Sequence, residues 1–231
     1  PIGLAIASKL KKAGAELILA VNNNDANAKS FTNSVPATIL SADLRNPQEV
    51  EKLIAETFDI NHQLDIVVNN AAIQNVENIS EIDSDSWDAV LETNLRSVHL
   101  VMRAALPALE KSKNASVVNI VSIEGHQPAR GHSHYSASKA ALLMLTKSAA
   151  LEYANLGIRV NSVSPGLIDD GNLKERWPEG LDRWLNSAPL GRVGDPKDIA
   201  DAVVFLSSPM ASWVTGSDLV VDGGISTNAT W

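Results

Sequence analysis

The chain has 231 residues, of which 45% are hydrophobic and 20% are charged, and this suits one globular α/β domain with a substantial core. Its formal net charge of −8 at pH 7 argues against nucleic acid and against an anionic membrane surface as partners, because both attract basic proteins. The sequence has no Cys for disulfides, thiol catalysis or Cys-bound zinc, and it has no run of about 18 apolar residues that would span a membrane.

Short apolar runs rich in β-branched residues alternate along the chain with segments of helical periodicity. In chain order we expect a helix at 2–13, strands at 17–21 and 38–41, a helix at 47–58, a strand at 64–68, a helix at 86–111, a strand at 116–121, a helix at 134–155, a strand at 159–163, a helix at 196–207 and a strand at 219–221. The strand at 116–121 is near-continuously apolar, which is typical of strands buried on both faces. The alternation predicts the α/β class, with a doubly wound parallel sheet covered by helices on both faces.

Tyr135 and Lys139 stand four residues apart in the predicted helix 134–155, so their side chains lie on one helical face. An ammonium group beside a phenol favours the phenolate and lowers the Tyr pKa from about 10. Such a Tyr can donate or accept a proton near neutral pH, and Ser122 beside it can hydrogen-bond the same substrate oxygen. These groups suit the interconversion of a carbonyl and an alcohol. The spacing alone is weak evidence, because many helices carry a half-buried Tyr and a solvated Lys at this distance.

The Tyr and Lys belong to a larger ordered set of motifs. The set comprises Asn69-Asn70-Ala71-Ala72, Asn94, Ser122, Tyr135, Lys139, Pro165-Gly166 and Asp222-Gly223-Gly224. With these motifs the sequence resembles the short-chain dehydrogenase/reductase family over essentially its whole length. The resemblance implies a single Rossmann-like, dinucleotide-binding catalytic domain over residues 1–231, with a substrate lid at about 167–190.

The resemblance also implies roles for four catalytic residues. Tyr135 is expected to be the general acid in carbonyl reduction and the general base in alcohol oxidation. Lys139 is expected to hold the nicotinamide ribose and to lower the Tyr135 pKa, while Ser122 orients the substrate oxygen. Asn94 is expected to interrupt a long helix and to hold a water that links Lys139 to solvent. The nicotinamide supplies the hydride, so the protein provides positioning and proton transfer.

The expected cofactor site begins at the N-terminus of helix 2–13, where free N–H groups and the helix dipole favour a pyrophosphate. The resemblance implies contacts from Ile2, Gly3, Asn22, Asp43, Leu44, Asn70, Ala71, Ala72, Tyr135, Lys139, Pro165, Gly166 and Ile168. Two of these residues have structural alternatives: Gly3 also suits helix–strand packing, and Asp43 also suits a helix or turn cap.

The choice of cofactor depends on the end of the strand at 17–21. An acidic residue there binds the ribose hydroxyls of NAD and repels the 2′-phosphate of NADP. This position holds Val21, and the following Asn22 and Asn23 can donate to a phosphate, although Asp25 is close and no Arg is near. We therefore expect NADP, with NAD as the alternative.

The beginning of the sequence departs from the family pattern. A strand and a turn of the form TGxxxGxG are expected there, but only Gly3 matches the last glycine, and Pro1 stands where the preceding glycine is expected. We therefore expect the first strand and most of the Gly-rich turn to be missing, and the sequence to be truncated relative to the natural chain.

Several polar residues and one Trp are candidates for substrate contacts. They are Glu124, His126, Gln127 and, in the lid, Trp177. The polar ones hint at a hydroxylated molecule, whereas His132 and His134 suit a solvated loop equally well. No metal site is predicted, because no second cluster of ligands accompanies these histidines.

We thus expect an NAD(P)-dependent oxidoreductase that interconverts a small alcohol and its ketone or aldehyde in the cytoplasm. A 3-oxoacyl-carrier-protein reductase is the more specific alternative, against which the net negative charge counts because the carrier is acidic. A non-catalytic dinucleotide-binding sensor or scaffold is the alternative of another class. The apolar circumference of helix 134–155 predicts a homotetramer, since the family pairs this helix and 86–111 across a two-fold axis and uses a segment like 214–225 in a second interface.

Overall fold

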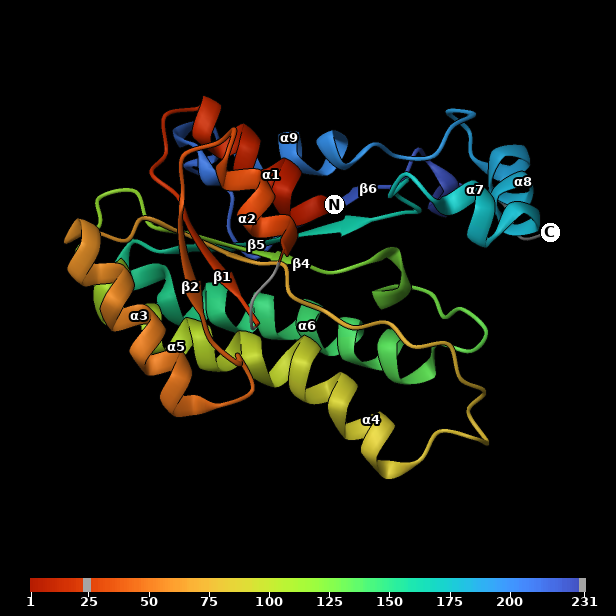
Figure 1. The fold of residues 1–231 in the computed structure, drawn as a ribbon, viewed down its shortest axis with the longest axis horizontal. Coiled ribbons are helices and arrows are strands. Elements are labelled where there is room, and N and C mark those ends of the chain that lie inside the picture. Colours follow the sequence, from red (N-terminus) through yellow and green to blue (C-terminus); the bar gives the residue numbers. More distant parts are fainter. Residues whose placement is uncertain (23–25, 229–231) are drawn as a thin grey trace.

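The computed structural model describes residues 1–22 and 26–228, and the six strands within these ranges pair in parallel (Figure 1). A two-stranded sheet contains β1 (Ile18–Val21) and β2 (Thr38–Ser41). A four-stranded sheet follows the order β3 (Ile66–Asn69), β4 (Ser116–Ile120), β5 (Arg159–Pro165) and β6 (Asp218–Val221). The parallel pairing and the helices between the strands confirm the predicted α/β fold class.

Helices lie on both sides of the strands (Figure 1). They are α1 (Ile2–Lys12), α2 (Ala26–Thr32), α3 (Pro47–Asn61), α4 (Ser84–Leu91), α5 (Ser97–Leu109), α6 (Ser133–Tyr153), α7 (Leu173–Arg176), α8 (Pro178–Ser187) and α9 (Pro196–Ser207). The predicted helices and strands are found with ends that differ by a few residues, and α2, α7 and α8 are additions to them.

Two hydrophobic clusters fill the space between helices and strands. On one side Val118 and Val163 pack with apolar residues of α1 and α9. On the other side Val117 and Val160 pack with residues of α3, α5 and α6. Val117 and Val118 are neighbours in β4 and point to opposite clusters, as the two-residue period of a strand requires. This is why the sequence of β4 is apolar throughout.

The helix predicted at 86–111 is interrupted in its middle. It consists of α4, a π-helical turn at Glu92–Arg96 and α5. Asn94 lies in this turn and is fully buried. A π-turn inserts one extra residue and redirects the side chains around it, and such turns are frequent at functional sites.

The strands do not form the single sheet that the sequence predicts. β1 pairs only with β2, and β3 pairs only with β4, so each keeps one unpaired edge within the described residues. Both edges line a groove of about 1420 Å³ that α1 and α9 also border. The sheet is therefore divided at the position where a doubly wound fold has a central strand.

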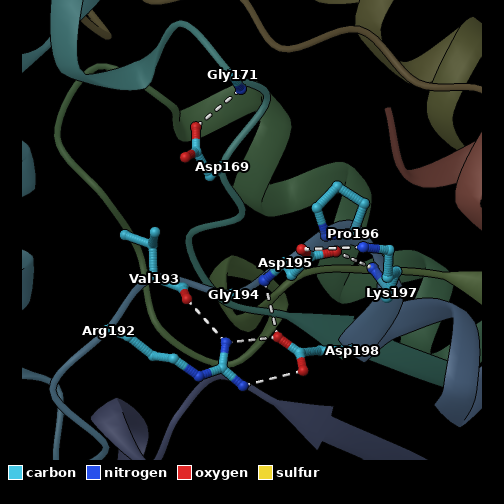
Figure 2. Close-up of a pocket in the computed structure, with 9 residues that line it drawn as sticks. All are labelled: Asp169, Gly171, Arg192, Val193, Gly194, Asp195, Pro196, Lys197 and Asp198. Carbon is cyan, nitrogen blue, oxygen red and sulfur yellow. Dashed lines mark hydrogen bonds and ion pairs between the residues drawn. The ribbon is translucent and has the colours of Figure 1, made fainter.

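The predicted lid at about 167–190 contains α7 and α8, which lie beyond the carboxyl end of β5 (Figure 1). Its base is closed by backbone hydrogen bonds of 2.9 Å from Gly194 N–H to Leu167 C=O and from Asp169 N–H to Gly194 C=O. Arg192 donates to both carboxylate oxygens of Asp198 at 2.7 and 3.0 Å beside this contact (Figure 2). The two ends of the lid are thus held together by hydrogen bonds.

Within the described ranges, no helix has both the length and the apolar character needed to cross a membrane.

Candidate active site

Helix α6 carries Tyr135 and Lys139 one turn apart, and both side chains are buried, with 8% and 2% of their surface exposed. The Lys139 Nζ atom lies 5.5 Å from the centroid of the Tyr135 ring. The same Nζ donates a hydrogen bond of 2.9 Å to the carbonyl oxygen of Ile120, the last residue of β4. The Lys139 ammonium is therefore fixed between the end of β4 and the phenol ring.

Burial dominates the proton affinities of this pair. The pKa of the Tyr135 phenol is raised from 10.0 to about 12, mainly because burial disfavours the phenolate. A hydrogen bond with Ser122 lowers this pKa, and the negative charge of Glu124 raises it. Burial also lowers the pKa of Lys139 from 10.5 to about 8. Burial thus opposes the expected lowering of the Tyr135 pKa, and the part of Lys139 in lowering it stays a prediction.

Ser122 follows β4 and begins a tight turn at Ile123–Gly125. Its hydroxyl accepts a hydrogen bond of 3.1 Å from the Glu124 N–H group, which fixes the direction of the side chain. Gly125 allows this turn to lie against α6, because a Cβ atom there would be only 3.1 Å from the Lys139 backbone. The close approach brings the Ser122 hydroxyl to the Tyr135 phenol.

Asn94 connects the π-turn to the loop after β3 and to α6. Its amide group exchanges two hydrogen bonds with the backbone of Ile73, at 2.8 Å to the N–H and 2.9 Å to the C=O. It also donates to the Ser138 hydroxyl at 3.2 Å. The Asn94 side chain thus contacts α6 at Ser138, the residue before Lys139. The water link from Asn94 to Lys139 stays a prediction.

The residues expected to hold a dinucleotide provide a fitting cradle. Pro1 gives α1 no side-chain cap, so the first N–H groups of this helix are available to an anion. Gly3 lies against the Asn70 side chain, and a Cβ atom on Gly3 would be 2.8 Å from the Asn70 Nδ2 atom. Gly166, after β5, is equally confined, since its Cβ atom would lie 2.8 Å from Asp222. A side chain at Gly3 or Gly166 would therefore displace Asn70 or Asp222, which border the expected cofactor site.

The other expected cofactor residues divide into two groups. Leu44, Asn70 and Ala71 line the groove between β1 and β3 together with Gly3, whereas Ala72 is exposed and does not line it. The Asp43 carboxylate accepts hydrogen bonds from the backbone and side chain of Arg45, at distances of 2.7–3.2 Å, so the turn-cap alternative is observed.

Three further positions bear on the cofactor. Asn22 is exposed just after β1, but Asn23 and Asp25, which the sequence argument also uses, lie outside the described residues. Asp170, near the PG turn, forms an ion pair of 2.7 Å with Arg176. Ile168 forms a backbone bridge with Gly194 at the base of the lid.

Glu124 and His126, two of the predicted polar substrate residues, bind different partners. Glu124 accepts a hydrogen bond of 3.0 Å from His132 and one of 3.2 Å from Gln74, and neither His132 nor Gln74 was among the predicted site residues. His126 instead lies 2.8 Å from the Asp218 carboxylate in β6. No sequence signal distinguishes these pairings, because they depend on the path of the loop between Ser122 and α6. The described residues include no group of three or more His, Asp or Glu that could hold a metal ion.

The two Trp residues of the lid have different neighbours, and the substrate contact of Trp177 stays a prediction. Trp177 packs on Gly180 within the lid, and Arg183 lies over its ring at 5.8 Å. Trp184 of α8 lies against Gly166, where a Cβ atom would be 3.0 Å from its ring. Gln127 is exposed and lies on the loop beyond the turn that Ser122 begins. Trp184 is therefore the Trp of the lid that contacts the turn at Gly166.

A dinucleotide cradle at a helix N-terminus, combined with a Ser–Tyr–Lys group, defines a nicotinamide-dependent oxidoreductase that acts on CH–OH groups. A family model described as enoyl-(acyl carrier protein) reductase matches residues 1–226. The 3-oxoacyl-(acyl-carrier-protein) reductase FabG of Vibrio cholerae is 35% identical over 225 residues, which cover 97% of this chain and 92% of that protein.

Two further proteins are similar over nearly the whole chain. The 2,5-dichloro-2,5-cyclohexadiene-1,4-diol dehydrogenase LinX of Sphingobium indicum is 31% identical, covering 96% of this chain and 91% of LinX. The solved structure of Thermoplasma acidophilum aldohexose dehydrogenase in ligand-free form has a TM-score of 0.90 at 31% identity, covering 100% of this chain and 91% of that one. The chain belongs to the short-chain dehydrogenase/reductase family and is an NAD(P)-dependent enzyme of that family.

Proposed function

We propose that this enzyme interconverts a small alcohol and its ketone or aldehyde, and that Ser122, Tyr135, Lys139 and Asn94 carry the reaction. The observation that supports this most strongly is the buried contact of Ser122, Tyr135 and Lys139 at the carboxyl end of β4. Two segments of the chain meet there, the end of β4 with the turn after it and the start of α6.

The proposed mechanism assigns one task to each group. Ser122 hydrogen-bonds the substrate oxygen and sets its distance from the phenol. Tyr135 gives its proton to that oxygen in reduction and takes it back in oxidation. Lys139 supplies the positive charge that stabilises the phenolate, and Asn94 holds α6 and the loop after β3 in register. The N-terminus of α1, Gly3, Asn70 and Gly166 would hold the NAD(P), which supplies or accepts the hydride when bound.

The cofactor is proposed to be NADP. The end of β1 carries Val21 and the exposed Asn22, so no described carboxylate at this position repels a 2′-phosphate. NAD remains the alternative, and comparison of the two dissociation constants decides between them. Action in the cytoplasm stays a prediction from the use of this cofactor.

Two substrate types compete for this site. FabG suggests a 3-oxoacyl thioester, whereas the names of LinX and the aldohexose dehydrogenase denote hydroxylated ring compounds. The polar Glu124 beside Tyr135 favours the hydroxylated type, because an acyl chain binds to apolar surface. A non-catalytic sensor would bind NAD(P) without turnover, and the complete Ser–Tyr–Lys group argues against it.

Replacement of the phenol hydroxyl tests the proposed function directly. Tyr135→Phe should lower kcat for ketone reduction by roughly 10²–10⁴, the usual contribution of general acid–base catalysis. The matched control is Tyr153→Phe at the other end of α6, because Tyr153 is the second of the 2 Tyr residues in the chain and lies away from the site. Equal turnover by Tyr135→Phe and the parent enzyme, with circular dichroism showing both folded, would disprove the mechanism.

A further inference from the structure

A polar cluster lies beside Tyr135 and has no part in the proton transfer described above. At its centre is the Glu124 carboxylate, whose side chain is only 16% exposed. It accepts hydrogen bonds from His132 at 3.0 and 3.1 Å, from the Ser136 hydroxyl at 3.2 Å and from Gln74 at 3.2 Å. The cluster joins the loop after β3, the turn after β4 and the start of α6, which meet at the carboxyl edge of the sheet, where ligands bind in such folds.

The cluster borders the two hydroxyl groups that hold the reacting oxygen. Glu124 is two residues after Ser122, and its backbone N–H donates to the Ser122 hydroxyl. Its charge acts on the Tyr135 phenol and raises the pKa of that group. The His132 ring meets the Tyr135 ring edge-on, with centroids 6.1 Å apart and an interplanar angle of 68°. Glu124 and His132 thus lie directly beside the two side chains proposed to hold the reacting oxygen.

A carboxylate at this place has an electrostatic cost for the proposed reaction. It opposes proton loss from Tyr135, which alcohol oxidation requires. A neutral Gln at position 124 would keep one acceptor oxygen, which could take the hydrogen bonds from His132 and Ser136 without this cost, but its NH2 group could not accept from Gln74. A substrate hydroxyl gives the negative charge a further function, because hydroxyl groups donate their strongest hydrogen bonds to ionised acceptors.

We propose that Glu124, oriented by His132 and flanked by Gln74, determines substrate specificity by accepting a hydrogen bond from a second hydroxyl group on the carbon next to the one that reacts. The inference rests on the proposed oxidoreductase function and names its substrate class, a vicinal diol or a sugar-like polyol. A 3-oxoacyl thioester has no hydroxyl donor at this position, so the Glu124 carboxylate would gain no hydrogen bond from it.

The test compares two alcohols that differ by one hydroxyl group, 1,2-cyclohexanediol and cyclohexanol, each with NADP and with NAD. The parent enzyme should have the higher kcat/KM for the diol. Glu124→Gln should reduce the ratio of the two kcat/KM values by roughly 10- to 100-fold, the loss expected for a hydrogen bond to a charged acceptor. Gln74→Ala, at an exposed loop position, should reduce the same ratio by a smaller factor and serves if Glu124→Gln is unstable.

A second measurement separates specificity from loop attachment. In Glu124→Gln the pH at which oxidation is half-maximal should fall for both alcohols, because the charge that raises the pKa of Tyr135 is removed. The matched control is Asp218→Asn, since the Asp218 carboxylate is also bonded to a His of the same loop, His126, but shows no coupling to Tyr135. This control should leave the diol-to-monoalcohol ratio unchanged.

The outcomes distinguish the inference from the function on which it rests. An unchanged ratio and pH profile in Glu124→Gln, with good turnover of cyclohexanol, would overturn the inference and leave the oxidoreductase function intact. Turnover of neither alcohol nor of the corresponding ketones by the parent enzyme, with either cofactor, would count against the proposed function and the inference together.

Discussion

At the scale of single residues, the buried Lys139 makes folding sensitive to pH. Its pKa falls from 10.5 in the unfolded chain to about 8 in the folded protein. Below pH 8 the ammonium is charged in both states, so the whole free-energy penalty of burying it reduces the stability of the fold. The penalty disappears as the pH rises through this window, because between pH 8 and 10.5 the unfolded state binds the extra proton. The shift corresponds to about 3 kcal/mol of unfolding free energy.

Lys139→Met should therefore be more stable than the parent protein at pH 7, although it loses the hydrogen bond to Ile120. Its advantage should shrink between pH 7 and pH 10, as the buried Lys139 of the parent protein loses its proton. Guanidinium unfolding at the two pH values measures the difference. A stability difference that does not change with pH would show that Lys139 is not strongly desolvated.

The sequence predicts which residues form this site better than it predicts their pKa values and hydrogen-bond partners. Tyr135 and Lys139 follow from helical spacing, and Ser122 follows from its place at the end of an apolar strand. The raised pKa of Tyr135 does not follow, because spacing reveals a neighbouring charge but not burial. The pairing of Glu124 with His132 depends on how a loop folds back, which no periodicity encodes.

At the scale of elements, the apolar strands were the most predictable part, since buried parallel strands leave continuous hydrophobic runs. The missed helices have weaker signals. α7 has only 4 residues, and α8 begins Pro-Glu-Gly, so neither shows the long apolar period of a core helix. The π-turn at Glu92–Arg96 was also beyond periodicity, although the family resemblance placed an interruption at Asn94.

The unpaired edges of β1 and β3 lead to a prediction about stability. Both edges expose backbone N–H and C=O groups to a groove lined by apolar side chains, and one parallel strand would satisfy both. A version that carries an apolar strand of about five residues and a Gly-rich turn ahead of Pro1 should unfold at higher guanidinium concentration and bind NADP more tightly than residues 1–231 alone.

A matched control for this experiment is an extension of the same length in which Pro and Asp replace alternate strand residues. It should give no stabilisation, because Pro cannot donate to a strand ladder. Equal unfolding midpoints for all three proteins would show that no strand binds between β1 and β3.

At the scale of the whole molecule, apolar side chains remain on the outer face of α6. Met144 is 61% exposed and Leu151 is 82% exposed, and with Ala137 and Ala140 they form a stripe along the helix. Neither the lid nor any other described segment covers this stripe. Exposed apolar patches of this kind mark interfaces.

A second exposed apolar surface lies near β6. It comprises Met210 and Trp213, which are 82% and 99% exposed, and Leu219 and Val220, which are 37% and 39% exposed. Two separate patches, each of which pairs with its own copy across a two-fold axis, would generate a closed tetramer with dihedral symmetry. We therefore propose that the enzyme is a homotetramer, with α6 in one interface and the β6 surface in the other.

Charge placed on each patch should split the tetramer in a defined way. Met144→Glu with Leu151→Glu should give dimers held by the β6 surface, because burying two carboxylates in an apolar contact is strongly unfavourable. Trp213→Glu should give dimers held by α6, and all three changes together should give a species near the chain mass of 24.6 kDa. Ile60→Glu, an exposed apolar position at the end of α3, is the control and should leave the mass unchanged. Light scattering at micromolar concentration measures these masses, and a parent protein near 24.6 kDa would rule out the tetramer.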